Sequence, residues 1–125
     1  MIKLLIVDDE KGITDALKDF FHSRGFAATA ANSGEEAIEA VKALRPDIVF
    51  LDIRMKGMSG LEALKKIKEM DKKIKVIMLT VHEEKEIVER AKELGADEYI
   101  TKPFRIDYLD EIVIKKVQEL LKEKS

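Results

Sequence analysis

The chain has 125 residues, no cysteine, and a formal net charge of -2 from 23 Lys and Arg against 25 Asp and Glu. This length fits one domain with one core over residues 1–125, and the near-neutral charge gives no electrostatic reason to expect binding to nucleic acid or to a membrane. Without cysteine there is no disulfide framework, no thiolate metal site and no thiol nucleophile, so a metal would be held by oxygen or by His22 and His82.

The first apolar run, Lys3 to Val7, predicts a short strand. It is too short for a signal peptide, and acidic residues stand where a cleavage site would be, so we expect a cytoplasmic protein. A helix is predicted next, with Gly25 placed after its end as a C-cap would be. Its apolar residues recur at helical spacing: Ile13, Ala16, Leu17, Phe20 and Phe21.

The second unit begins with a weak strand predicted over Phe26 to Ala31. A capping box follows at Ser33 and Glu36 and opens a helix that Pro46 closes. The apolar stripe of this helix consists of Ala37, Ile38, Val41 and Leu44.

The third strand is the most apolar part of the chain. Ile48 to Leu51 shows no polar alternation, which is typical of a strand covered on both faces, and Asp52 stands at its end. A second capping box begins at Ser59 and predicts a helix. The apolar face of that helix consists of Leu61, Leu64, Ile67 and Met70.

Two further strand and helix pairs are expected. Lys75 to Thr80 predicts the fourth strand, and a helix from about Glu83 to Leu94 follows it without a strong N-cap residue, so its first turn should fray. Glu98 to Thr101 predicts the fifth strand. After a turn, Asp107 can cap a last helix that runs almost to the end of the chain. Its apolar stripe consists of Leu109, Ile112, Val113, Val117, Leu120 and Leu121.

Five strands alternating with five helices predict an α/β fold, in which a parallel sheet has helices on both faces. The carboxyl ends of parallel strands lie at one edge of the sheet, where open α/β sheets place their chemistry. Strand-end residues from the first, third, fourth and fifth strands should therefore meet there: Asp8, Asp9, Asp52, Thr80 and Lys102.

Three neighbouring carboxylates repel one another unless a cation compensates. Mg²⁺ prefers hard oxygen ligands, so we expect it at Asp9 and Asp52, with Asp8 acting directly or through water, and Mn²⁺ as a substitute. Lys102 and Thr80 could then direct a positive charge and a hydroxyl at an anion beside Asp52. These are the parts that phosphoryl transfer needs, with the Asp52 carboxylate as a nucleophile that becomes an acyl phosphate.

Over its whole length the chain resembles a receiver domain of the two-component response regulators. The residues that carry this resemblance follow in order: Asp8-Asp9, Asp52, Met58-Ser59-Gly60, Thr80, Tyr99 and Lys102-Pro103-Phe104. The resemblance implies a flavodoxin-like (βα)5 three-layer sandwich with strand order 2-1-3-4-5. It also implies that Asp52 is the phosphoacceptor, that the backbone carbonyl of Arg54 joins Asp9 and Asp52 as a metal ligand, and that the Lys102-Pro103 bond is cis.

The function implied by the resemblance is a phosphorylation-controlled signalling module. Asp52 would take its phosphoryl group from a sensor histidine kinase or a phosphotransfer protein that docks over the first helix, near Ile13, and the loop after Lys102. The domain is not expected to be a classical enzyme, although it would catalyse its own phosphorylation and dephosphorylation. Thr80 and Tyr99 would switch the face made by the fourth helix, fifth strand and fifth helix.

That face would act on a downstream protein or an output domain, and the resemblance is compatible with a homodimer that depends on phosphorylation. No output domain is expected after the last helix. A stand-alone phosphorelay or motility protein and an excised receiver of a transcription factor are therefore both open. Nucleic acid and membrane are not expected partners of the domain itself.

The sequence departs from the family pattern at a few positions. Lys56 stands where proline is usual, which frees a backbone dihedral and adds a charge near the site. Val81 is bulkier than the usual small residue. Arg54 and His82 occupy variable positions that influence the lifetime of the acyl phosphate, although His82 alone is read more simply as an exposed loop residue.

Three other interpretations compete with this one. The acidic pair could merely cap the first helix. A haloacid-dehalogenase-like phosphatase also uses an Asp nucleophile, but it places that residue after the first strand in a DxD pattern, whereas here Ile53 and Arg54 follow Asp52. A flavin-binding flavodoxin needs a Ser, Thr and Gly-rich phosphate loop where this chain has Asp8, Asp9 and Glu10.

Overall fold

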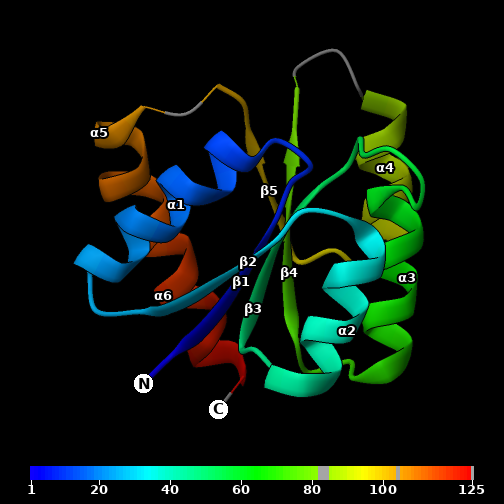
Figure 1. The fold of residues 1–125 in the computed structure, drawn as a ribbon, viewed down its shortest axis with the longest axis horizontal. Helices are drawn as coiled ribbons and strands as arrows, with labels where there is room; N and C mark the ends of the chain where they lie inside the picture. Colours follow the sequence, from blue (N-terminus) through cyan, green and yellow to red (C-terminus); the bar gives the residue numbers. More distant parts are fainter. Residues whose placement is uncertain (82–84, 104, 125) are drawn as a thin grey trace.

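The computed structural model describes residues 1–81, 85–103 and 105–124. In this part of the chain, five parallel strands form one sheet in the order β2-β1-β3-β4-β5, which confirms the expected flavodoxin-like arrangement (Figure 1). The strands are β1 (Lys3–Val7), β2 (Ala27–Ala31), β3 (Ile48–Asp52), β4 (Lys75–Thr80) and β5 (Glu98–Thr101).

Helices cover both faces of the sheet and make the predicted three layers. Figure 1 shows α1, α5 and α6 on one side and α2, α3 and α4 on the other. Their bounds are α1 (Lys11–Ser23), α2 (Gly34–Leu44), α3 (Gly60–Met70), α4 (Lys85–Glu93), α5 (Ile106–Tyr108), the π-helix η1 (Leu109–Val113) and α6 (Ile114–Lys124). In the residues described, no helix combines the length and the apolar character needed to cross a bilayer.

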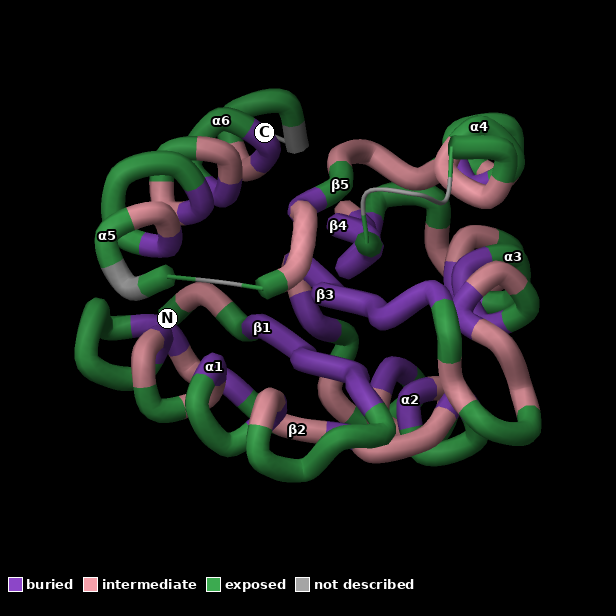
Figure 2. The backbone as a smooth tube through the Cα atoms, turned by 90° about the horizontal axis from the view of Figure 1, so that it is seen from above, coloured by how far each residue is buried: buried purple, intermediate pink, exposed green. Residues whose placement is uncertain are grey.

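The apolar run of β3 is explained by the two halves of the core. Successive strand residues point to opposite faces, so Ile48 and Phe50 pack with α1 and α6, whereas Val49 and Leu51 pack with α2 and α3. All four side chains are at most 1% exposed, and Figure 2 shows β1, β3 and β4 as the buried centre of the sheet. A strand with two covered faces needs no polar alternation.

The two predicted caps are present, and one of them differs in detail. Ser33 accepts a hydrogen bond from the Glu36 N–H at 3.1 Å, and Ser59 accepts one from the Glu62 N–H at 3.2 Å. The Glu36 carboxylate accepts from the N–H of Asn32, the residue before the cap, at 3.1 Å. The carboxylate that would close the capping box thus fixes the loop that leads into α2.

The end of α1 explains why the second strand starts one residue later than predicted. Gly25, at φ 87°, donates its N–H to the carbonyl of His22, and Phe26 donates to the carbonyl of Phe21. This pair of bonds is a Schellman motif, in which a glycine takes the left-handed conformation. It keeps Phe26 against Phe21, with ring centroids 5.7 Å apart, so β2 begins at Ala27.

The last helix differs from the prediction in two ways. The Leu109 N–H donates to the Arg105 carbonyl at 2.9 Å, so the helix begins before Asp107 and Asp107 lies inside its first turn. The π-turn then inserts a residue, since the Ile114 N–H bonds back to Leu109. Ile112 is turned outward and is 39% exposed, so its predicted place in the apolar stripe was wrong.

A close backbone contact joins the end of β3 to the start of α3. Gly60 donates its N–H to the Ile53 carbonyl at 2.9 Å, and a Cβ on Gly60 would overlap the carbonyl oxygen of Asp52. Only glycine allows this approach. The contact fixes the direction in which the chain leaves Asp52. The predicted start of the fourth helix, at residues 82–84, lies outside the described residues.

Candidate functional site

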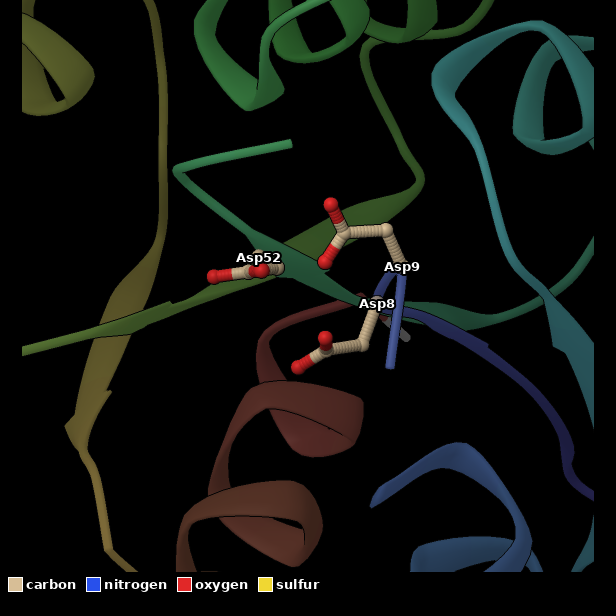
Figure 3. Close-up of side chains that lie close together, drawn as sticks. All are labelled: Asp8, Asp9 and Asp52. Carbon is tan, nitrogen blue, oxygen red and sulfur yellow. The ribbon is translucent and has the colours of Figure 1, made fainter. Parts of the chain in front are cut away.

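The strand register brings three carboxylates together at the predicted edge. Val7 pairs with Leu51 on the neighbouring strand, and Asp8 and Asp52 are the residues that come directly after this pair. One carboxylate oxygen from each of Asp8, Asp9 and Asp52 lies within 4.8 Å of the others. Figure 3 shows this grouping, with Asp8 and Asp9 from the end of β1 and Asp52 from the end of β3. The acidic cluster predicted from the sequence therefore forms.

Lys102 reaches this cluster from the end of β5. Its backbone N–H donates to the Thr80 carbonyl at 2.7 Å, which continues the pairing of β4 with β5. Its Nζ lies 2.6 Å from Asp8 Oδ2 and 3.3 Å from Asp52 Oδ1. The Lys102-Pro103 peptide bond is cis, as the resemblance implies. A single ammonium group thus connects two of the carboxylates.

Asp8 and Asp9 differ in how much of each carboxylate is already used. Asp8 is fully buried, and its Oδ1 accepts from the Glu10 N–H at 3.0 Å while its Oδ2 faces Lys102. Asp9 is exposed, and its Oδ2 accepts from the backbone N–H of Lys56 at 3.3 Å. The N-cap residue of α1 is Glu10, so the interpretation of the acidic pair as a helix cap is not supported.

Burial and the neighbouring charges change the pKa of Asp52. Burial, followed by the negative charge of Asp8, raises the pKa of Asp52 from 3.8 to about 6, although Lys102 acts in the opposite direction. For Lys102, burial lowers the pKa, but the hydrogen bond to Asp8 and the charges of Asp52 and Asp8 outweigh it and leave the pKa raised. The lysine stays charged, and the carboxylates remain short of positive charge.

The donor set fits a hard divalent cation. Asp9 lines a pocket of about 400 Å³ together with Arg54, Lys56 and Ser59, and carboxylate oxygens of Asp8 and Asp52 lie within 4.8 Å of that of Asp9. Oxygen ligands without sulfur or imidazole suit Mg²⁺ or Mn²⁺. His22 lies elsewhere, at the end of α1, where its Nε2 contacts the Ala28 carbonyl at 2.9 Å. His82 and Phe104 lie outside the described residues.

Thr80 and Tyr99 lie on neighbouring strands but face different surroundings. The Thr80 side chain is buried, and its Oγ1 donates to the Val81 carbonyl at 3.2 Å. Tyr99 is 39% exposed, and Lys92 Nζ lies 5.3 Å from its ring centroid. A pocket of about 290 Å³ lies beside Tyr99 and is bounded by Ile53, Met78, Val88 and Ala91 among others. Val81 is exposed at the end of β4.

One polar residue at this edge, Asn32, was not predicted from the sequence. Asn32 follows β2, and its Nδ2 donates to the Asp8 carbonyl at 2.9 Å and to Thr14 Oγ1 at 3.0 Å. The second strand ends at the same edge of the sheet as the other parallel strands. That strand end was the signal that could have pointed to Asn32.

Comparison with known proteins gives consistent matches over most of the chain. The profile described as response regulator receiver domain matches residues 4–114. Sporulation initiation phosphotransferase F of Bacillus subtilis (strain 168) is 41% identical over 113 residues, which cover 90% of this chain and 91% of that protein. The regulatory protein AtoC of Escherichia coli (strain K12) is 37% identical over 116 residues, which cover 93% of this chain but 25% of the relative.

Solved structures agree with the sequence matches. A CheY-like response regulator receiver domain protein from Methanospirillum hungatei JF-1 matches with a TM-score of 0.90 at 29% identity, covering 98% of both chains. The likeness therefore extends over the whole sheet and the helices on both of its faces.

Proposed function

This chain belongs to the response regulator receiver domain family, a class of phosphorylation-based signalling modules, and on that premise we propose that Asp52 accepts the phosphoryl group. The observation that carries the proposal is the position of Lys102 Nζ, 3.3 Å from Asp52 Oδ1 at the edge where Asp8 and Asp9 also lie. The comparisons give no support to the phosphatase alternative.

The chemistry assigned to Asp52 is nucleophilic. One carboxylate oxygen forms a bond to phosphorus as the bond from phosphorus to the donor's imidazole nitrogen breaks, and that nitrogen keeps the electron pair. Lys102 and the Thr80 hydroxyl would stabilise the phosphoryl oxygens, since both lie at the same strand ends. Dephosphorylation is a separate reaction, in which water attacks the phosphorus, the Asp52 carboxylate leaves with the electron pair of the broken bond, and inorganic phosphate is released.

Asp9, Asp52 and the backbone carbonyl of Arg54 are the proposed holders of Mg²⁺, or of Mn²⁺ in its place. Asp8 is proposed to act through water, because both of its oxygens already have partners. The bound ion would neutralise the carboxylates and the approaching phosphoryl oxygens. Arg54 and Val81, both exposed beside the site, are the described residues proposed to tune the lifetime of the acyl phosphate.

Receiver domains interact with histidine kinases or phosphotransfer proteins. For the docking surface we propose the apolar groove of about 680 Å³ between α1 and the segment that follows β5, which Ile13, Phe20 and Pro103 line among others. Lys102 also lines this groove and contacts Asp52. A partner helix lying there would bring its phosphohistidine to the site.

The output face is proposed to be the surface of α4, β5 and α6. A phosphoryl group on Asp52 would draw the Thr80 hydroxyl away from the Val81 carbonyl, and the Tyr99 ring could then turn from the surface into the pocket beside it. A nearly complete switch needs about 5 kcal/mol of differential stabilisation. A downstream protein, an output domain or a second copy of the chain would recognise the changed face.

Phosphorylation can be tested on the intact protein. With acetyl phosphate or a phosphohistidine donor and Mg²⁺, mass spectrometry should detect one added phosphoryl group in the wild type and in the control Asp15→Asn, an exposed Asp on α1. Asp52→Asn should show none, and removal of Mg²⁺ should abolish labelling of the wild type. Comparable labelling of Asp52→Asn would show that another residue is the acceptor.

The switch needs its own measurement. NMR spectra with and without beryllofluoride, a phosphoryl mimic, should show changes at Thr80, Tyr99 and the start of β5. If the changes stay confined to the Asp52 pocket, the proposed coupling to the α4, β5 and α6 face is wrong, whereas the phosphoacceptor assignment stands. Size-exclusion chromatography of the same samples tests whether beryllofluoride causes two copies of the chain to associate.

A further inference from the structure

Asn32 lies beside the acidic cluster, where its side chain bonds to the backbone of Asp8 and not to the Asp8 carboxylate. Its side-chain amide donates one hydrogen bond to the Asp8 carbonyl at 2.9 Å and one to Thr14 Oγ1 at 3.0 Å. These partners are 24 and 18 residues away in sequence. A carboxamide has two N–H donors, so both are used to connect the end of β2 with the turn between β1 and α1.

Both sides of this connection are fixed. On one side, the Asn32 N–H donates to Glu36 Oε1 at 3.1 Å, which ties the residue to the first turn of α2. On the other side, Thr14 is fully buried and its hydroxyl donates to the Lys11 carbonyl at 3.0 Å. Asn32 therefore joins the start of one helix to the start of another.

In the turn between β1 and α1, the Glu10 N–H and Lys102 Nζ donate to the Asp8 carboxylate and the Lys56 N–H donates to the Asp9 carboxylate, whereas Asn32 holds the Asp8 backbone carbonyl. The N-cap residue of α1, Glu10, makes no side-chain capping bond, and both Asp9 and Glu10 are exposed. The Asp8 N–H donates to the Ala31 carbonyl at 3.2 Å, which extends the β1 and β2 pairing by one residue. The Asp8 carbonyl belongs to the peptide group that leads into Asp9, so its bond to Asn32 acts together with the Lys56 N–H in directing the Asp9 carboxylate.

We propose that Asn32 is a positioning residue for the acidic turn. By anchoring the Asp8 carbonyl, it keeps the Asp9 carboxylate within reach of Asp52, so that both can hold one divalent cation. The part that concerns the cation rests on the proposed function. Residues that orient metal ligands without binding the metal commonly change metal affinity by tenfold or more when substituted.

The test compares Asn32→Ala and the milder Asn32→Ser with the wild type. Calorimetric titration of the folded proteins with Mg²⁺ should give a dissociation constant about tenfold higher for Asn32→Ala. Acetyl phosphate labelling should need correspondingly more Mg²⁺ but reach the same maximum, because the acceptor and Lys102 are intact.

Two controls separate positioning from a general loss of stability. Thr14→Val removes only one of the two acceptors, and Ser33→Ala removes the cap of α2 next to Asn32. Both should lower the midpoint of urea unfolding yet keep the Mg²⁺ dissociation constant within about twofold of wild type. A tenfold loss of affinity in Ser33→Ala would overturn the proposal, because any loosening of the loop would then suffice. Wild-type affinity in folded Asn32→Ala would overturn it as well.

A readout without metal keeps this proposal distinct from the proposed function. In Asn32→Ala, amide hydrogen exchange at Asp8 and Glu10 should be at least about tenfold faster, while amides in the middle of β4 keep their protection. Unchanged exchange at the two amides overturns the role of Asn32. If the exchange changes as expected but wild-type protein and Asp9→Ala bind Mg²⁺ equally, the metal assignment fails and the positioning role stands.

Discussion

The two edges of the sheet use the same residue types in opposite proportions. At the edge formed by the amino ends of the strands, Asp97 Oδ2 accepts from Lys68 Nζ and from the Val76 N–H, both at 2.8 Å, and its Oδ1 lies 3.9 Å from Lys75 Nζ. At the opposite edge, Asp8, Asp9 and Asp52 are grouped together, and Lys102 contacts two of them. At the first edge Asp97 has two lysine neighbours, one of which, Lys75, also lies 3.6 Å from Glu123, whereas at the other edge Lys102 contacts two carboxylates of a cluster of three.

This difference separates stabilisation from function. A carboxylate with all its partners in place stabilises the loop and strand that it joins. Carboxylates that have too few positively charged neighbours repel one another and destabilise the fold. A bound cation reduces this repulsion, so the stability of the site depends on its ligands. Burial is the largest cause of the raised pKa of Asp52, and the neighbouring negative charge of Asp8 adds to it. The predictions below start from this contrast.

The largest effect is expected at the balanced edge. Asp97→Ala should lower the free energy of unfolding by about 3 kcal/mol, because it leaves the partly buried Lys68 without its carboxylate and the Val76 N–H without its acceptor. Urea unfolding measures this. The control Glu39→Ala removes an exposed ion pair with Lys42 and should cost less than about 0.5 kcal/mol. Equal losses in the two variants would remove the contrast.

Asp52→Asn, in contrast to Asp97→Ala, should raise the free energy of unfolding. Its folded-state pKa of about 6 lies above its ordinary value, so the stability that the Asp52 carboxyl contributes is fully present below about pH 4 and is lost as the pH rises through 6. Replacing it with Asn should therefore stabilise the metal-free protein by about 2 kcal/mol at pH 7 and by little at pH 4. Urea unfolding in EDTA across this range is the measurement, and a difference independent of pH would contradict the assignment.

Divalent cations should stabilise only through the acidic edge. At tenfold excess over its dissociation constant, Mg²⁺ should add about 1.4 kcal/mol to the wild type. Mg²⁺ should stabilise Asp97→Ala by the same amount, because Asp97 lies far from the acidic cluster and acts independently of it. It should stabilise Asp9→Ala much less. Thermal unfolding with and without EDTA tests this, and an equal gain in Asp9→Ala would remove Asp9 from the ligand set.

The smallest effect concerns the exposed charge near the pocket. Lys56→Ala keeps the N–H that donates to Asp9 Oδ2 but removes an ammonium group from the pocket lining. Mg²⁺ should bind about twofold more tightly at low salt, and the gain should vanish near 0.5 M salt because exposed charges are screened. A gain that persists at high salt would mean that the loop has moved.

Much of this arrangement could be predicted from local patterns. The unbroken apolar run at Ile48 to Leu51 predicted a strand with two covered faces, and the structure confirms it. The meeting of Asp8, Asp52 and Lys102 followed from the rule that parallel strands end at one edge. The order of the strands could not be obtained from periodicity, and it came from the resemblance to receiver domains.

Other features depend on hydrogen bonds between distant residues, which periodicity does not reveal. The Schellman motif removed Phe26 from the second strand, and the π-turn exposed Ile112. Both arise from backbone bonding at the end or middle of a helix. The position of Asn32 at the end of a strand could have been predicted, but its bonds to Asp8 and Thr14 could not, because these partners lie on another segment. The outward position of Tyr99 is a choice between side-chain conformations that the sequence leaves equally open.

The contact between Lys102 and the acidic cluster also orders events during synthesis. Translation proceeds from the amino terminus at about 5–20 residues per second, so Lys102 is made roughly 3–10 s after Asp52. Until then the nascent chain contains the three carboxylates without the lysine that bridges two of them. Their repulsion opposes the docking of β3 beside β1. Lys102 directly follows β5, the last strand of the sheet, so we expect the sheet to close more readily once β5 and Lys102 have left the ribosome.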